Sequence, residues 1–168
     1  MRNGKATVAP KQKPGRSRQD FGTPPEFIAA VKTHLDIGRF GWDLAASEDN
    51  CKADSYIDEE INSLTLDWSL VAHDGWNWLN PPFGYIAPWA AKCAASKALC
   101  QVAMLVPAGV GANWFRDFVD GHAFVLFLNG RLSFDGIAPY PKDCMLCLYS
   151  LLLAPGYCVW NWRAPVII

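Results

Sequence analysis

The tetrapeptide Asn80-Pro81-Pro82-Phe83 carries the residues best suited to chemistry. It directly follows a short apolar run, residues 76–79, which predicts a buried strand that the two prolines end. Asn80 Oδ1 and the Pro81 carbonyl can accept both hydrogens of a planar amino group, such as that of adenine, while Phe83 stacks on the ring. Prolines hold this arrangement, so the segment favours binding an amino group during methyl transfer. An ordinary turn followed by a packing aromatic ring is the alternative.

The elements that must position this segment predict an α/β fold with a hairpin near the end. Thr23 is expected to cap the first helix, with Pro24 at its first position. Asn129-Gly130 predicts a tight hairpin turn. Residues 48–70 are expected to form a polar loop with short elements. We expect strands at residues 38–44, 76–79, 101–107, 123–129, 131–134, 145–153 and 157–162, and helices at 25–35, 86–98 and 113–119.

A second polar segment, residues 43–47, follows the expected strand 38–44 in the same way that the tetrapeptide follows strand 76–79. Ligands of α/β sheets bind beyond the carboxyl ends of the strands. The two segments are therefore expected to form one pocket.

Charge is distributed unevenly along the chain, although the net charge is only −1. Residues 1–18 carry six basic residues and no acid, whereas the remainder carries 9 basic and 16 acidic residues. We predict a flexible basic arm at residues 1–19 and one domain at residues 20–168. Such an arm suits a polyanionic partner, or is a solvated tail without one. The arm's basic residues are Arg2, Lys5, Lys11, Lys13, Arg16 and Arg18.

The six cysteines are expected to be buried free thiols rather than metal ligands, because the Cys144/Cys147 pair lies within an expected strand. The sequence contains no run of eighteen apolar residues, so no membrane span is predicted. The residues after Met1 lack the apolar segment of a secretory signal. We therefore expect a cytoplasmic location and no metal.

With these motifs the chain resembles the phage-type DNA N-6-adenine methyltransferases, which are Dam-like. The resemblance spans residues 20–150, and its motifs occur in the family's order. It implies a Rossmann-like, S-adenosylmethionine-dependent methyltransferase fold in one small domain with a C-terminal β-hairpin. It also implies methylation of a flipped adenine in double-stranded DNA. The motifs are residues 21–24, 42–47, 62–64 with 67–68, 78–83, 105–108 with 114–115, and 129–134.

The resemblance also implies roles for single residues. The catalytic, adenine-binding motif would be Asn80, Pro81, Pro82 and Phe83. The methionine end of the cofactor would contact Thr23, Pro24, Asp43, Ala45, Ala46 and Ser47. The acid for the cofactor ribose stays open among Asp54, Asp58 and Asp67. Phosphate contacts could come from Lys11, Lys13, Arg16 and Arg18 of the arm, and from Lys92, Lys97, Arg116 and Arg131 of the body.

One departure from larger methyltransferases is that Ala45 and Ala46 stand where a glycine-rich loop is usual. Two alternatives remain open. The same tetrapeptide could methylate another amino group, in cytosine, RNA adenine or protein glutamine. The chain could also be a non-catalytic nucleic-acid-binding module on a decayed methyltransferase fold. The recognition sequence and the oligomeric state are not predicted.

Overall fold

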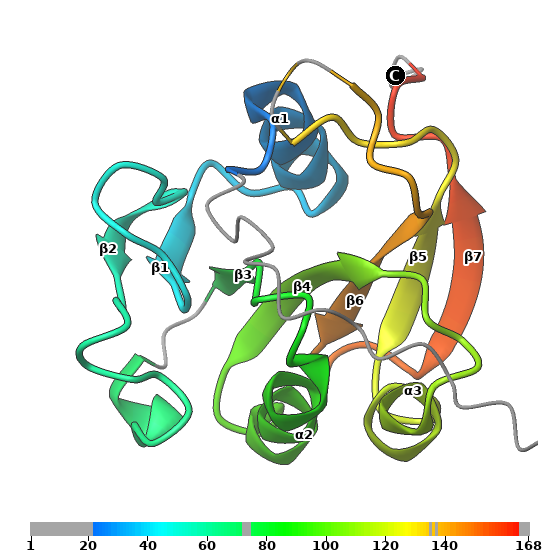
Figure 1. Cartoon of the computed structure of the whole chain (residues 1–168). Helices are drawn as coiled ribbons and strands as arrows, with labels where there is room; N and C mark the ends of the chain where they lie inside the picture. Colours follow the sequence, from blue (N-terminus) through cyan, green and yellow to red (C-terminus); the bar gives the residue numbers. More distant parts are fainter. Residues whose placement is uncertain (1–21, 72–74, 135, 137, 165–168) are drawn as a thin grey trace, which may run out of the picture.

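The computed structural model describes residues 22–71, 75–134, 136 and 138–164. They form one seven-stranded sheet with helices on both faces (Figure 1), as the predicted α/β fold requires. The expected basic arm, residues 1–19, lies outside the described residues. The strands are β1 (Phe40–Asp43), β2 (Ala53–Tyr56), β3 (Trp76–Leu79), β4 (Gln101–Pro107), β5 (Phe124–Leu128), β6 (Cys144–Tyr149) and β7 (Gly156–Trp160). The helices are α1 (Pro25–His34), α2 (Ile86–Ser96), α3 (Asn113–Phe118) and the short 3-10 helix η1 (Trp68–Val71).

The sheet is mostly parallel. Its strand order is β2-β1-β3-β4-β6-β5-β7, and β6 alone runs antiparallel to its two neighbours. The pairs β1–β2, β1–β3, β3–β4 and β5–β7 are all parallel. As a result β1 and β3 end side by side at one edge, where Asp43 is in register with Trp78.

Two apolar cores cover the two faces of the sheet, because successive side chains of a strand point in opposite directions. In β4, Val102, Met104 and Val106 belong to the core under α2 and α3. Ala103 and Leu105 belong to the opposite core under α1. Burial on both faces explains why β3 and β4 are mostly apolar, with Asn77 as the one polar residue of β3, and both strands have the predicted bounds.

The predicted cap of α1 is wrong. The residue that precedes the helix is Pro24, whose carbonyl accepts from the amides of Phe27 and Ile28 at 3.1 Å each. The Thr23 side chain makes no capping hydrogen bond, because its hydroxyl is turned into a pocket described below. Pro24 therefore takes the cap position, and Thr23 is left for another role.

The strand predicted at residues 131–134 is also wrong, so no tight hairpin forms at Asn129-Gly130. Gly130 does adopt the left-handed conformation of a turn, with φ of 106°. The chain then folds inward, because Leu132 and Phe134 are buried in the core under α1. The antiparallel partner of β5 is β6, which begins only at Cys144.

Strand β2 was not predicted. It is short, polar and half exposed, because it forms the edge of the sheet beside β1. No helix of the described residues has the length and apolar character needed to cross a membrane.

Candidate functional site

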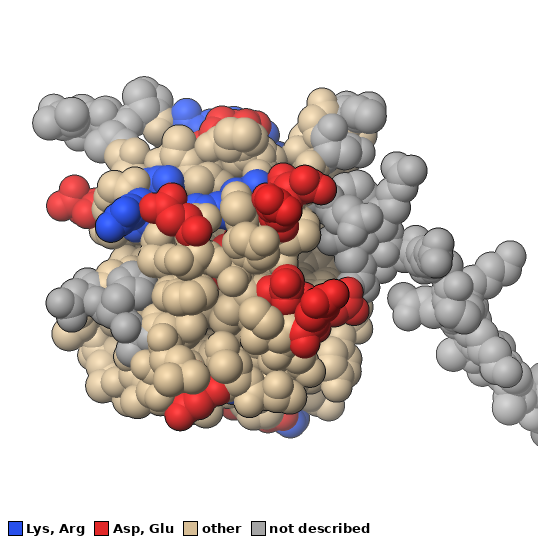
Figure 2. Space-filling view, turned by 90° about the vertical axis from the view of Figure 1, so that its left-hand side faces the viewer, with Lys and Arg blue, Asp and Glu red and all other residues tan. Residues whose placement is uncertain are grey.

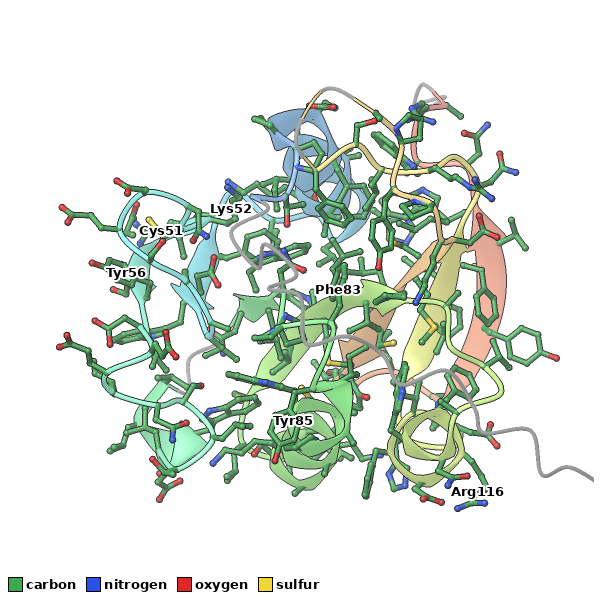
Figure 3. The ribbon with its side chains drawn as sticks, viewed as in Figure 1. Cys51, Lys52, Tyr56, Phe83, Tyr85 and Arg116 are labelled. Carbon is green, nitrogen blue, oxygen red and sulfur yellow. The ribbon has the colours of Figure 1, made fainter. Side chains whose placement is uncertain are left out.

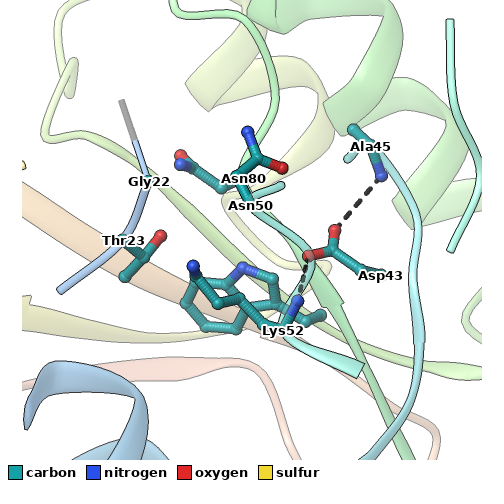
Figure 4. Close-up of a pocket in the computed structure, with 8 residues that line it drawn as sticks. Gly22, Thr23, Asp43, Ala45, Asn50, Lys52 and Asn80 are labelled. Atoms are coloured by element: carbon teal, nitrogen blue, oxygen red, sulfur yellow. Dashed lines mark hydrogen bonds between the residues drawn. The ribbon is translucent and has the colours of Figure 1, made fainter. Parts of the chain in front are cut away.

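A pocket lies where β1 and β3 end, and eight residues line it (Figure 4). Asp43 is the last residue of β1, and Asn80 directly follows β3. Thr23 enters from the segment before α1. The complete lining is Gly22, Thr23, Asp43, Ala45, Asn50, Lys52, Trp78 and Asn80. The structure therefore brings the two polar strand exits together in one pocket.

Asp43 is the central acid of the pocket, and its side chain is only 2% exposed. Its Oδ2 accepts from the Lys52 amide at 3.0 Å, and its Oδ1 accepts from the Ala45 amide at 3.4 Å. Burial raises the pKa of Asp43 to about 6, although both hydrogen bonds and the Lys52 charge act in the opposite direction. The pocket thus holds a buried carboxylate whose charged form a cationic ligand group would stabilise.

Thr23 is also 2% exposed, and its hydroxyl has no hydrogen-bond partner among the described residues. Burying a hydroxyl without a hydrogen-bond partner costs the free energy of its hydration and gains no hydrogen bond. Such hydroxyls therefore usually bind a ligand or a water molecule. Asn80 Oδ1 is buried at the pocket as well. Trp78 is fully buried beneath them, packed against Phe27 and Phe40 with ring centroids 6.5 Å and 5.3 Å away.

The enclosed part of the pocket is small, with a cavity volume of about 30 Å³. Pockets that enclose a whole cofactor-sized ligand measure about 300–1,000 Å³. The pocket can therefore enclose only one polar end of such a ligand.

The rest of the tetrapeptide leads away from the pocket toward a cluster of three aromatic rings. Phe83 packs against Phe134 and Tyr140, each with a centroid distance of 5.6 Å, and those two rings are 5.4 Å apart. Phe83 is only half buried. The cluster forms because residues 131–134 fold inward instead of forming a strand. It holds the Phe83 ring in one orientation near the middle of the molecule (Figure 3).

Other predicted cofactor residues lie around the pocket without lining it. Ala46 donates its amide to the Ile57 carbonyl at 3.1 Å, and the Ser47 amide donates to Asn50 Oδ1 at 2.9 Å. These bonds shape the loop that carries Asn50 and Lys52 into the pocket. Pro24 is buried as the residue before α1.

The candidate ribose acids do not line the pocket. Asp58 Oδ1 accepts from the Ile61 amide at 3.0 Å, and Asp67 Oδ1 accepts from the Ser69 amide at 2.9 Å. Asp54 pairs with Arg39 at 3.1 Å on the exposed surface. Each acid therefore has a local structural partner.

The basic residues proposed for phosphate contact are not gathered at the pocket. Arg116 pairs with Asp117 at 2.7 Å on α3, at the opposite end of the molecule from Lys52 in Figure 3. Arg131 pairs with Asp143 at 3.1 Å. Lys92 donates to the carbonyls of Leu64 and Leu66, and Lys97 donates to that of His122. Lys11, Lys13, Arg16 and Arg18 lie outside the described residues.

All six cysteines are free thiols in the structure, but the predicted burial is wrong for two of them, because Cys158 is exposed and Cys51 is half-buried. Cys144 and Cys147 are buried on β6, and burial raises the pKa of Cys144 to about 12. Within the described part of the chain, no three cysteine, histidine or acidic residues are grouped to hold a metal ion.

Sequence reasoning missed Gly22, Asn50, Lys52 and Trp78 as pocket residues. Trp78 was expected only in the core. Asn50 and Lys52 carried a weak signal, since both follow the predicted polar exit at residues 43–47 by a few positions. What brings them back over Asp43 is the turn at residues 47–51, where the Ser47 carbonyl accepts from the amides of Asn50 and Cys51 at 3.1 Å.

The model of one protein family, DNA N-6-adenine-methyltransferase (Dam), matches residues 11–143. The chain belongs to this family. The match includes every residue that lines the pocket, as well as Phe83, Phe134 and Tyr140. The family's sequence pattern therefore spans both the pocket and the aromatic cluster.

Two phage proteins are similar to the chain, and both are named DNA N-6-adenine-methyltransferase. The protein of Escherichia phage T1 is 28% identical over 123 residues, which cover 73% of this chain and 50% of that protein. The protein of Haemophilus phage HP1 is 28% identical over 122 residues, which cover 71% of this chain and 68% of that protein. The chain thus spans about half the length of the first relative.

Proposed function

We propose that the chain transfers a methyl group from S-adenosylmethionine to the exocyclic amino group of adenine in double-stranded DNA. Membership of the DNA N-6-adenine-methyltransferase family is the observation that carries this proposal. The names of the two phage relatives and the mixed α/β sheet agree with it. We assign the sheet to the Rossmann-like methyltransferase class, in which an antiparallel strand such as β6 is inserted near one edge.

The pocket fits one end of the proposed cofactor. When bound, S-adenosylmethionine supplies an electrophilic methyl group on a sulfonium centre. Its methionine end carries a carboxylate and an ammonium group. The buried Thr23 hydroxyl, which has no partner in the described part of the chain, and the buried Asp43 carboxylate are complementary to such groups. Asn80 lines the same pocket, which would place the tetrapeptide beside the methyl group.

Asn80 Oδ1 and the Pro81 carbonyl would accept the two amino hydrogens of the target adenine. Two such bonds favour a tetrahedral nitrogen, whose lone pair can then attack the methyl group in line. No strong base is needed, because the proton can leave after the transfer. Most of the rate would come from the geometry held by Pro81 and Pro82.

An adenine in duplex DNA must leave the base stack to reach this position. Phe83 would stack on the extruded base, which is typically worth about 1–3 kcal/mol for base–aromatic contacts. Its packing against Phe134 and Tyr140 supports this role, because the ring orientation is held before the base arrives.

DNA would approach from the side of Phe83 rather than that of β2. The segment from Glu48 to Asp67 contains seven acids and one lysine, and Figure 2 shows acids prominent on this face. Such a face repels phosphates. The basic arm at residues 1–19 would supply phosphate contacts that the paired Arg116 and Arg131 do not readily provide.

The test is transfer of a labelled methyl group from S-adenosylmethionine to unmethylated duplex DNA, followed by nucleoside analysis. The expected product is N-6-methyladenine. The Asn80→Ala variant should lose transfer while it keeps its affinity for S-adenosylmethionine, whereas Asn161→Ala, an exposed asparagine outside the pocket, should keep both. Label in cytosine would support a different target base. No label together with no cofactor binding would favour the non-catalytic nucleic-acid-binding module.

A further inference from the structure

The Lys52 side chain spans the pocket from one end to the other (Figure 4). Its backbone amide donates to Asp43 Oδ2 at 3.0 Å. Its ammonium nitrogen lies 3.6 Å from the position that a Cβ on Gly22 would take. Because Gly22 directly precedes Thr23, the ammonium lies at the threonine end of the pocket, opposite the contact with Asp43.

The Lys52 ammonium has no hydrogen bond or ion pair with any residue that the structure describes. Lys92 and Lys97 differ, since their ammonium groups donate to backbone carbonyls. The Thr23 hydroxyl likewise has no partner among the described residues. Two donors that have no acceptor among the described residues therefore share one end of the pocket, as a site for a two-oxygen anion requires.

The other end of the pocket is negative. Each oxygen of Asp43 already accepts one backbone amide, and each can accept a further donor. A positive end and a negative end within one small pocket are complementary to a zwitterion. The α-carboxylate and α-ammonium of an amino acid form such a zwitterion, and the enclosed volume admits little more than these groups.

We propose that Lys52 is the residue by which the chain recognises the α-carboxylate of its cofactor. The Lys52 ammonium and the Thr23 hydroxyl bind this carboxylate, while Asp43 binds the α-ammonium of the same amino-acid end. The inference rests on the proposed function, in which the cofactor is S-adenosylmethionine.

The test compares two ligands that differ in one group, S-adenosylmethionine and its decarboxylated analogue, by equilibrium calorimetry on the full chain. Lys52→Met should weaken binding of S-adenosylmethionine by about 10- to 100-fold, the usual range for a lost charged hydrogen bond. Binding of the decarboxylated analogue should change less than about threefold. Lys52→Arg should retain the preference for the carboxylate, and Lys142→Met, an exposed lysine outside the pocket, should bind both ligands as the unaltered chain does.

The outcomes separate the two proposals. An equal loss of affinity for both ligands in Lys52→Met, with thermal unfolding unchanged, would overturn the role of Lys52 and leave the proposed function standing. Unchanged affinity for S-adenosylmethionine would do the same. If the unaltered chain binds neither ligand, both proposals fail. Thr23→Val provides a second test. It should also weaken the binding of S-adenosylmethionine more than the binding of its decarboxylated analogue.

Discussion

Replacing Asp43 by asparagine should remove a specific pH dependence from the stability of the protein. Asp43 has an ordinary pKa of 3.8, which burial raises to about 6 in the folded chain. The folded state therefore binds the Asp43 proton more tightly than the unfolded state does. The stability that protonation contributes is present below about pH 4 and is lost as the pH rises through 6.

The magnitude follows from the two pKa values. Each pKa unit corresponds to about 1.36 kcal/mol. The free energy of unfolding should thus fall by about 2–3 kcal/mol between pH 4 and pH 7 because of Asp43 alone. An asparagine side chain does not titrate, so the difference in unfolding free energy between the unaltered chain and Asp43→Asn should change by this amount.

Urea denaturation of both proteins at several pH values measures this difference. The absolute stability of Asp43→Asn will also shift, because an amide cannot accept from both the Ala45 and the Lys52 amides. That shift is the same at every pH, so only the change with pH tests the reasoning. Asp67→Asn is a control in which the pH dependence should have the opposite sign. Hydrogen bonds from Ser69 lower the pKa of Asp67, so the stability contributed by this carboxylate is lost as the pH falls. Parallel stability curves for the unaltered chain and Asp43→Asn would refute the account of Asp43.

Three further predictions concern the ligands and the surface. The affinity for S-adenosylmethionine should fall as the pH drops through about 6, because protonated Asp43 cannot pair with the α-ammonium; calorimetry should find no such fall in Asp43→Asn. Deleting residues 2–18 should weaken DNA binding and reduce its salt dependence. If the slope of the binding constant against salt concentration is unchanged, the arm does not contact the DNA phosphates. Lys92→Met should lower the free energy of unfolding by about 1–3 kcal/mol, because the Leu64 and Leu66 carbonyls lose their donor, while the salt dependence of DNA binding stays unchanged.

Local sequence was sufficient for the elements buried on both faces. β3 and β4 have their predicted bounds, because each is a short, mostly apolar run, and a proline stands at the end of β4 and two residues after the end of β3. The α/β class followed from the alternation of such runs with amphipathic helices. The family was also visible in sequence, because its motifs occur in order at the strand exits.

Tertiary structure decided what happens where local signals are weak or compete. Thr23 has the local signature of a helix cap, but Pro24 takes the position before the helix and the Thr23 hydroxyl turns into the pocket. Asn129-Gly130 has the local signature of a hairpin, but burial of Leu132 and Phe134 draws the chain inward. The edge strand β2 is polar and depends on pairing with β1, so its sequence carries little sign of a strand.

The pocket shows the same division. Asp43 and Asn80 could be placed together from sequence, because consecutive polar exits of parallel strands meet at one edge of a sheet. Lys52 could not be placed, because its position depends on a turn and on the pairing of its amide with a buried carboxylate. Sequence alone thus determined the buried strands β3 and β4, the family and the tetrapeptide. Only the tertiary structure decided which charged side chains line the pocket proposed for one end of the cofactor. The reason is that these side chains come from segments that are far apart in the sequence and follow no regular spacing.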